Sequence, residues 1–205
     1  MNEKLASYTG ILVDEFDRIP DERKKVLREL ADFVSEEIEK KRVARLVFIC
    51  THNSRRSHFG QVWAKTAAFY YGTGNVETYS GGTEATAFNP RAVNALKDAG
   101  FEIGISLAGD NPVYEISFSD SAPEILAWSK KYDSVDNPHQ DFCSIMTCSQ
   151  ADAECPYIPG ATLRISLPYE DPKLYDGTER ETEAYSERCR EIALEMFYLF
   201  SKVGQ

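Results

Sequence analysis

Residues 45–57 read RLVFICTHNSRRS and join an apolar run to a polar loop. The run over residues 45–49 suits a strand that is buried on both faces. The segment from residue 57 to residue 71, which follows the loop, has a helical pattern of apolar side chains. A strand, a loop and a helix in this order form the unit from which parallel sheets are built.

The same alternation continues along the chain. Further strands are predicted at residues 76–80, 142–147 and 163–167, and further helices at residues 90–99 and 181–203, while residues 106–140 are the least regular stretch. The predicted fold class is therefore α/β, with three layers and a central parallel four-stranded sheet flanked by helices.

The N-terminal part of the chain is predicted to be a helical extension. Residues 20–42 form an amphipathic pattern that Pro20 opens, with apolar side chains at three- and four-residue steps. We assign residues 1–42 to this extension and residues 43–205 to a catalytic domain. Docking of the helix on its own domain is favoured, because burial of such a stripe is what stabilises surface helices. Binding of a partner is the alternative.

Composition narrows the classes of function. The 205 residues include 33 acidic and 23 basic ones, which gives a formal net charge of −10. This charge opposes binding to nucleic acid. No apolar run approaches the roughly 20 residues that cross a membrane, and the charged N-terminus is not a signal peptide, so a cytoplasmic protein is expected. Five cysteines, an odd number, favour free thiols over a disulfide framework.

The loop between the first strand and its helix has the chemistry of an oxyanion site. Cys50 and Arg56 are separated by five residues, and loop amides together with a helix N-terminus attract an anion. The same field stabilises a thiolate, so Cys50 is predicted to be the nucleophile and Arg56 to grip the oxyanion. A structural loop with a buried cysteine is the alternative. The predicted substrate-binding residues are Thr51, His52, Asn53, Ser54, Arg55, Arg56 and Ser57, with Asn53 and Ser57 also fixing the loop and donating a hydrogen bond to the sulfur.

Over about residues 43–200 the sequence resembles the low-molecular-weight protein tyrosine phosphatase superfamily, and within it the thioredoxin-coupled arsenate reductases. The resemblance rests on VFICT at residues 47–51 with the Asn-Ser and Arg-Ser pairs that follow, on YSGGTEA at residues 79–85 and on NPRA at residues 89–92. It implies the low-molecular-weight phosphatase fold, an arsenate or phosphate-type substrate, thioredoxin as the electron donor, and no bound cofactor or metal.

A second cysteine segment separates the two enzyme classes. Reduction of arsenate takes two electrons, so a second thiol must attack the sulfur of the arsenic adduct. The segment TCSQADAECP at residues 147–156 is similar to the redox segment of the reductases, which implies that Cys148 attacks Cys50 and that Cys155 then attacks Cys148. A zinc site or a structural disulfide is the alternative. Cys143 and Cys189 match no cysteine of the family and are interpreted as packing residues.

The spacing of Cys148 and Cys155 makes a physical prediction. Seven residues of helix separate two positions by about 10.5 Å along the axis. A disulfide requires Cα atoms within roughly 7 Å. If the segment is helical when reduced, it must unwind on oxidation, and we predict that it then exposes its disulfide to thioredoxin.

The acid candidate is Asp171, in the sequence YEDP at residues 169–172. It resembles the Asp-Pro pair of the superfamily, whose aspartate protonates the leaving oxygen in phosphatases. A turn without chemistry is the alternative reading of the same pair. Lys173 and Leu174 follow where phosphotyrosine phosphatases place aromatic side chains, which weakens the phosphotyrosine hypothesis.

Three residues depart from the family pattern. His52 replaces a small residue and narrows access to the loop, and Arg55 replaces a second loop cysteine and adds positive charge beside the anion. Gln61 replaces a carboxylate that some relatives associate with a potassium ion, so no metal site is predicted.

Two rival functions remain at this stage. A low-molecular-weight phosphatase acting on phosphotyrosine or a small phosphoester needs only Cys50, Arg56 and Asp171. A redox-sensing or oxyanion-binding adaptor would use the N-terminal helix to engage a partner.

Overall fold

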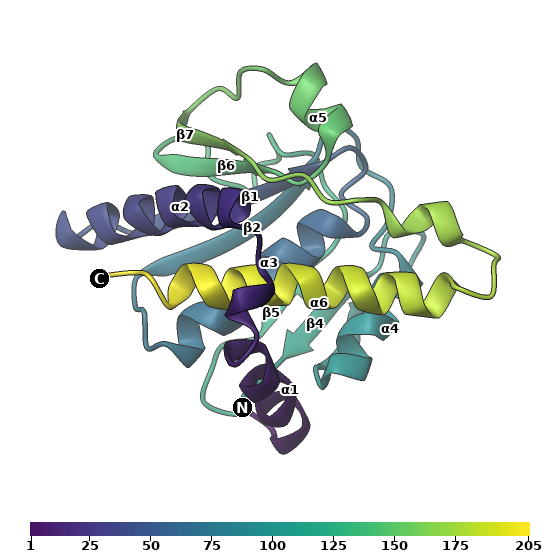
Figure 1. The fold of residues 1–205 in the computed structure, drawn as a ribbon. Helices are drawn as coiled ribbons and strands as arrows, with labels where there is room; N and C mark the ends of the chain where they lie inside the picture. The colour runs from purple at the N-terminus through teal and green to yellow at the C-terminus, as the bar shows by residue number, and fades with distance from the viewer.

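The computed structural model describes residues 1–205, and a four-stranded parallel sheet forms its centre (Figure 1). The strands are β1 (Ala44–Cys50), β2 (Val76–Gly82), β6 (Phe142–Met146) and β7 (Ala161–Ser166). They are arranged in the order β2-β1-β6-β7, and every neighbouring pair is parallel. The predicted central sheet is therefore confirmed, with strand ends that differ from the predicted ones by no more than two residues.

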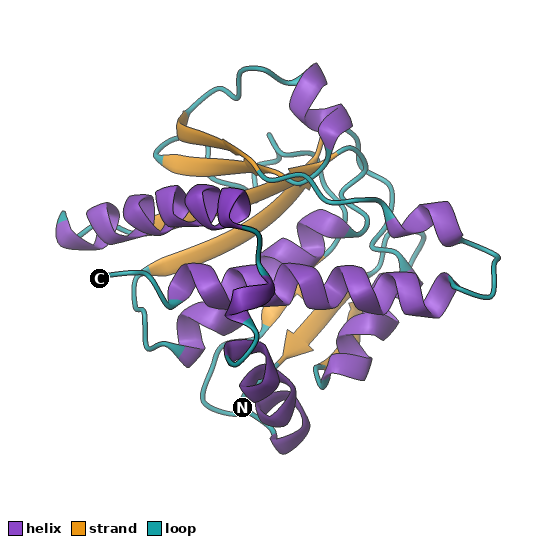
Figure 2. Cartoon of the chain, viewed as in Figure 1, coloured by secondary structure: helices purple, strands orange, loops and turns teal.

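Helices cover both faces of the sheet, as predicted (Figure 2). The α-helices are α1 (Glu3–Val13), α2 (Asp21–Glu39), α3 (Arg56–Tyr70), α4 (Pro90–Ala99), α5 (Ser149–Glu154) and α6 (Glu181–Phe200), and two short 3-10 helices are η1 (Phe16–Arg18) and η2 (Pro172–Tyr175). In Figure 1, α6 crosses the front of the molecule, with α2 and α3 beside it. None of the helices is both long and apolar enough to span a membrane.

The two faces of the sheet pack against hydrophobic clusters of different size. Leu46 and Phe48 of β1 belong to the main core of 44 buried residues, beneath α2, α3 and α6. Val47 and Ile49 face the other way, into a cluster of eight buried residues that includes Ala151 of α5. Successive side chains of a strand point to opposite faces, so burial of both faces explains the unbroken apolar run of β1, which precedes the oxyanion loop.

A second, smaller sheet was not predicted. Its strands are β3 (Glu102–Leu107), β4 (Val113–Ser117) and β5 (Ile125–Ala127), and both pairings are antiparallel. Part of the stretch interpreted as the least regular is thus ordered as a sheet. The apolar side chains of β3 do alternate, at Ile103, Ile105 and Leu107, but most residues of this strand are exposed. The strands β4 and β5 have only five and three residues, too few for a clear alternation.

The N-terminal segment packs on the rest of the chain. Leu27, Leu30 and Val34 of α2 are fully buried, which places the predicted amphipathic stripe against the domain's own core. Helix α1 was not predicted. It begins at an N-cap in which Asn2 accepts a hydrogen bond from the amide of Leu5, and it packs on α4 and α6. The boundary between residues 42 and 43 stays a prediction.

The topology gathers the candidate site at one edge of the sheet. Since all four strands are parallel, the loops that follow them leave from the same edge. The chain passes from β1 to β2 on one side and later returns to β6 on the other side of β1, so the loops after β1 and β6 diverge. Ligands of open α/β sheets bind at such a point. Cys50 ends β1, and Cys148 follows β6 by two residues.

Candidate active site

The loop between β1 and α3 is shaped by Asn53. This residue adopts a left-handed backbone conformation with φ of 44°, which asparagine tolerates better than most side chains. Its side-chain oxygen accepts a hydrogen bond from the amide of Lys130 at 2.8 Å, and its side-chain nitrogen donates to Ser57 Oγ at 2.9 Å. Asn53 therefore fixes the curvature of the loop.

The loop turns its carbonyl groups outward. The carbonyl oxygens of Cys50, Thr51 and Ser54 accept hydrogen bonds from the amides of Thr83, Glu84 and Asn89, respectively. By contrast, the backbone N–H groups of residues 51–57 donate to no backbone carbonyl. A run of successive amides without carbonyl partners at a helix N-terminus is an arrangement that binds anions. The loop thus has the donor arrangement that an oxyanion requires.

Gly82, at the end of β2, is required for the approach of the two segments. A Cβ atom at this position would lie 2.7 Å from the nitrogen of Asn53 and 2.7 Å from the carbonyl oxygen of Thr51. Only glycine allows β2 to end against the loop backbone at this distance. The sequence motif at residues 79–85 therefore contributes to the site through its backbone.

His58 supports the loop from below. Its ring is fully buried, with Nε2 at 2.9 Å from the carbonyl oxygen of Asn53 and Nδ1 at 3.2 Å from Ser80 Oγ. Burial, together with the charge of Lys130, lowers the pKa of His58 to about 3, so the imidazole is neutral at physiological pH. His58 thus has a structural role beneath the loop.

Cys50 lies at the base of the loop and is 4% exposed. Its sulfur is 3.1 Å from Ser57 Oγ. Because that hydroxyl already accepts a hydrogen bond from Asn53, its own proton is available for the sulfur. Of the two residues predicted to donate to the sulfur, Ser57 contacts it directly, whereas Asn53 donates to Ser57 and makes no hydrogen bond to the sulfur itself.

Arg56 and Asp171 are brought together by the loop that follows β7. The Arg56 guanidinium donates through Nη1 to the carbonyl oxygen of Tyr169 at 2.9 Å and through Nη2 to Asp171 Oδ2 at 2.6 Å. The Nε group of Arg56 is buried and has no hydrogen-bond partner in the chain. An unpaired buried donor is costly, so its presence beside the loop fits a group that pairs with a bound anion.

The other predicted loop residues have separate partners. The Arg55 guanidinium donates to the hydroxyl of Tyr185 at 2.8 Å and lies 3.8 Å from Asp176, so its charge is directed to those groups and away from the expected position beside the anion. Ser54 Oγ donates to the carbonyl oxygen of Ala87 at 2.7 Å. The His52 ring is partly exposed at the surface, 3.6 Å from a carboxylate oxygen of Glu84.

Cys148 lies on the same side of the sheet as Cys50. It is 2% exposed and belongs to the same apolar cluster as Cys50. Its sulfur is 3.4 Å from the hydroxyl of Thr51, the residue that follows Cys50 in the loop. Cys148 is also the N-cap of α5 and accepts a hydrogen bond from the amide of Ala151. The structure therefore places this thiol next to the oxyanion loop.

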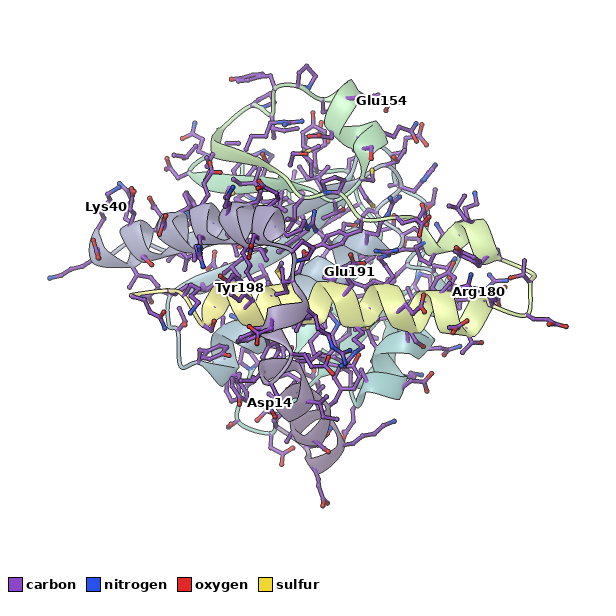
Figure 3. The ribbon with its side chains drawn as sticks, in the orientation of Figure 1. Asp14, Lys40, Glu154, Arg180, Glu191 and Tyr198 are labelled. Atoms are coloured by element: carbon purple, nitrogen blue, oxygen red, sulfur yellow. The ribbon has the colours of Figure 1, made fainter.

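Cys155 ends α5 and contacts the same cluster. Burial raises the pKa of the Cys155 thiol. Arg164 of β7 holds α5 in place through three hydrogen bonds. It donates to Asp152 Oδ1 at 2.6 Å, to the carbonyl oxygen of Asp152 at 2.8 Å and to the carbonyl oxygen of Cys155 at 3.1 Å. Figure 3 shows Glu154, the last residue of α5, at the periphery of the molecule.

All five cysteines are free thiols. Cys143 and Cys189 are buried in the main core, apart from the cluster that contains Cys50 and Cys148 and that Cys155 packs against. Burial raises the pKa of both thiols, to about 12 for Cys189. Their surroundings are those of packing residues. No group of three or more His, Cys, Asp or Glu side chains is placed to hold a metal ion.

Sequence reasoning missed two supports of the site. The amide of Lys130 holds Asn53, and the carbonyl group of Tyr169 holds Arg56. Both contacts are made by backbone atoms, and no residue type is required for a backbone contact. The only signal in the sequence is the position of Tyr169, two residues before Asp171.

Known proteins resemble this chain in sequence and in fold. The arsenate reductase of Bacillus licheniformis is 30% identical over 160 residues, which are 78% of this chain and 96% of the relative. A solved arsenate reductase in the phosphate binding state has a TM-score of 0.52 at 18% identity and covers 79% of this chain and 100% of its own. A low-molecular-weight phosphotyrosine phosphatase from Vibrio cholerae O395 has a TM-score of 0.52 at 14% identity and covers 77% and 95%. No family model matches.

Proposed function

Because this chain belongs to the arsenate reductase family, we propose that it reduces arsenate to arsenite through the thiols of Cys50, Cys148 and Cys155. The observation that carries the proposal is the position of Cys148, whose sulfur lies 3.4 Å from Thr51 Oγ1 within the cluster that also contains Cys50 and contacts Cys155. A hydrolase has no use for a second thiol at that place, since water can cleave the phosphocysteine intermediate.

In the first step the loop binds arsenate and Cys50 attacks it. The backbone amides of the loop and the unpaired Nε of Arg56 receive the oxygens. The Cys50 thiolate forms a bond to arsenic, and one arsenic–oxygen bond breaks. The departing oxygen takes up protons and leaves as water. Asp171, which is hydrogen-bonded to Arg56, is the residue assigned to this proton transfer.

In the second step Cys148 is the nucleophile. Its thiolate attacks the Cys50 sulfur, a disulfide bond forms, and the sulfur–arsenic bond breaks. The electron pair of that bond stays on arsenic, so arsenic(V) becomes arsenic(III) and leaves as arsenite. The two electrons come from the two thiols, which are oxidised to a disulfide.

In the third step Cys155 moves the oxidation to the surface. It attacks Cys148, the disulfide is transferred to these two residues, and Cys50 is released as a thiolate. Cys155 is partly exposed, whereas Cys50 and Cys148 are buried, so the final disulfide is the one that an external dithiol can reach. Thioredoxin, in the reducing cytoplasm, is the electron donor that we assign.

The wild-type protein is expected to reduce arsenate repeatedly when thioredoxin, thioredoxin reductase and NADPH are supplied. Without its third thiol, Cys155→Ser is expected to release about one arsenite per chain and then to stop, because the Cys50–Cys148 disulfide cannot be transferred. Arsenite release is measured with thioredoxin as the only external thiol. Repeated turnover by Cys155→Ser at the wild-type rate contradicts the role of Cys155. Hydrolysis of an aryl phosphate by the wild type without arsenate reduction contradicts the reductase assignment.

Oxidation is expected to unwind α5. This helix has six residues, with Cys148 as its N-cap and Cys155 as its C-cap. The two cysteines are thus at opposite ends of the helix, where about 10.5 Å of rise separates their positions, more than a disulfide can bridge. The amides of Asp152 and Cys155, which donate to the carbonyl groups of Cys148 and Ala151, should lose protection from hydrogen exchange after one turnover. Cys155→Ser is the control, and unchanged protection in the oxidised wild type contradicts the expectation.

A second candidate function is phosphate ester hydrolysis, because Cys50, Arg56 and Asp171 are assembled without any contribution from Cys148. Leu174, near the acid candidate, is 69% exposed and gives the rim an aliphatic side chain where a phosphotyrosine pocket would use an aromatic one. The variant that separates reduction from hydrolysis is Cys148→Ser.

A further inference from the structure

An arginine of the N-terminal helix α2 reaches the loop that holds the site arginine. Arg23 donates through Nη1 to the carbonyl oxygen of Pro168 at 3.2 Å. Its guanidinium lies over the ring of Tyr169, 4.8 Å from the ring centroid. Arg23 therefore contacts two successive residues of the segment that connects β7 to Asp171.

A buried carboxylate of α6 completes this contact. Glu195 is 3% exposed, and its two oxygens accept hydrogen bonds from Arg23 Nε at 2.8 Å and Arg23 Nη2 at 2.7 Å. The Tyr169 hydroxyl donates to the same carboxylate at 2.6 Å. A buried carboxylate persists only when such donors compensate for its lost hydration, so the three side chains hold one another in a fixed geometry.

Tyr169 transmits this geometry to Arg56. Its amide donates to the carbonyl oxygen of Thr147 at 3.1 Å, and its carbonyl oxygen accepts from Arg56 Nη1 at 2.9 Å. Its hydroxyl is anchored on Glu195, so the residue is fixed at its backbone and at the far end of its ring. The position of Tyr169 in turn determines where the Arg56 guanidinium is held and which of its donors remain for an anion.

We propose that Arg23 and Glu195 are positioning residues, which set the orientation of Arg56 for oxyanion binding through Tyr169. The proposal rests on the proposed role of Arg56 as the oxyanion-binding side chain. It gives α2 a part in building the site although α2 supplies no residue to the oxyanion loop. Loss of the pair should weaken binding of the oxyanion more than it changes the subsequent chemistry, because Cys50, Ser57 and the loop amides have other supports.

The test compares two double variants, each of which removes one ion pair that includes a residue of α2 and a buried glutamate. R23Q/E195Q removes the pair at Tyr169 and leaves no unpaired buried charge. R42Q/E37Q removes the Arg42–Glu37 pair near the other end of α2, where Glu37 is also buried, at 5% exposed, and accepts a hydrogen bond from Arg42 Nε at 2.7 Å. Binding of inorganic phosphate is measured by calorimetry, KM and kcat are measured for arsenate, and thermal unfolding is recorded for all variants.

R23Q/E195Q is expected to raise the Kd for phosphate and the KM for arsenate by about 5- to 20-fold, with a change in kcat of less than about threefold. R42Q/E37Q is expected to leave the phosphate Kd within about twofold of wild type, even where it lowers the unfolding temperature as much. A general loss of stability would not raise KM while leaving kcat nearly unchanged. It would also not distinguish R23Q/E195Q from R42Q/E37Q.

Tyr169→Phe keeps both charges and provides a second variant if R23Q/E195Q does not fold. It removes only the hydroxyl anchor, and a rise in the phosphate Kd of about two- to fivefold is expected. The proposal is overturned if the variants bind phosphate as tightly as wild type, if R42Q/E37Q weakens binding equally, or if the wild type binds no phosphate. Absence of arsenate turnover in a wild type that still binds phosphate would contradict the proposed function alone.

Discussion

Cys148→Ser is expected to lower the thioredoxin-dependent rate of arsenate reduction by at least about 1000-fold. A serine hydroxyl is not ionised at neutral pH and cannot form a disulfide with Cys50, so the arsenic adduct cannot be reduced by this route. In the wild type the Cys148 sulfur contacts the Thr51 hydroxyl and accepts a hydrogen bond from the amide of Ala151. A serine hydroxyl at this position can make the same two contacts. The effect should therefore come from lost chemistry rather than from lost structure.

The same variant should leave aryl phosphate hydrolysis and phosphate binding within about threefold of wild type, since neither requires a second thiol. Cys143→Ala is the matched control, because Cys143 is also buried and lies in β6, just before the loop that carries Cys148. Its arsenate reduction should remain near that of wild type. Continued arsenate reduction by Cys148→Ser would rule out the relay. Parallel loss of hydrolysis would show that the substitution damages the oxyanion loop.

Arg56→Lys is expected to lower kcat/KM about 100- to 1000-fold for both arsenate and an aryl phosphate, because both reactions use the same oxyanion site. Lysine keeps the charge but lacks the planar set of donors that bonds Tyr169, Asp171 and the anion at once. The measurement is steady-state kinetics with each substrate, together with phosphate binding.

Arg55→Gln provides the comparison for Arg56→Lys. The Arg55 guanidinium is bonded to Tyr185 and lies near Asp176, so removing its charge is expected to change kcat/KM by no more than about threefold. An effect as large as that of Arg56→Lys would restore the sequence-based expectation that Arg55 acts on the anion. A small effect of Arg56→Lys would contradict the assignment of Arg56.

The parts of the site that the sequence predicts are those encoded locally. Cys50, Asn53, Ser57 and Arg56 lie within one strand–loop–helix unit, and their roles follow from the spacing and from the properties of a helix N-terminus. Likewise, strands buried on both faces produce continuous apolar runs, so the central sheet was predicted with its strand ends nearly correct.

The parts that the sequence does not predict depend on partners far away in the chain. Arg23 and Glu195 are 172 residues apart, and nothing near either residue identifies the other. Helix α1 includes Thr9 and Gly10, residues of lower helix propensity, and its stability comes from packing on α4 and α6. The three short strands β3, β4 and β5 are stabilised by pairing with one another, and the sequence of one strand does not identify its pairing partner.

The contacts of Arg164 are expected to stabilise the reduced form of α5. A single guanidinium ties Asp152 and Cys155 to β7, and these ties must be released before a disulfide can join the two ends of α5. In the proposed relay, oxidation must therefore break the hydrogen bonds that Arg164 makes in the reduced protein. If the proposed relay operates, reduction of the disulfide by the electron donor should allow these bonds to form again. Recovery between catalytic cycles would then be the refolding of one short helix on the edge strand β7.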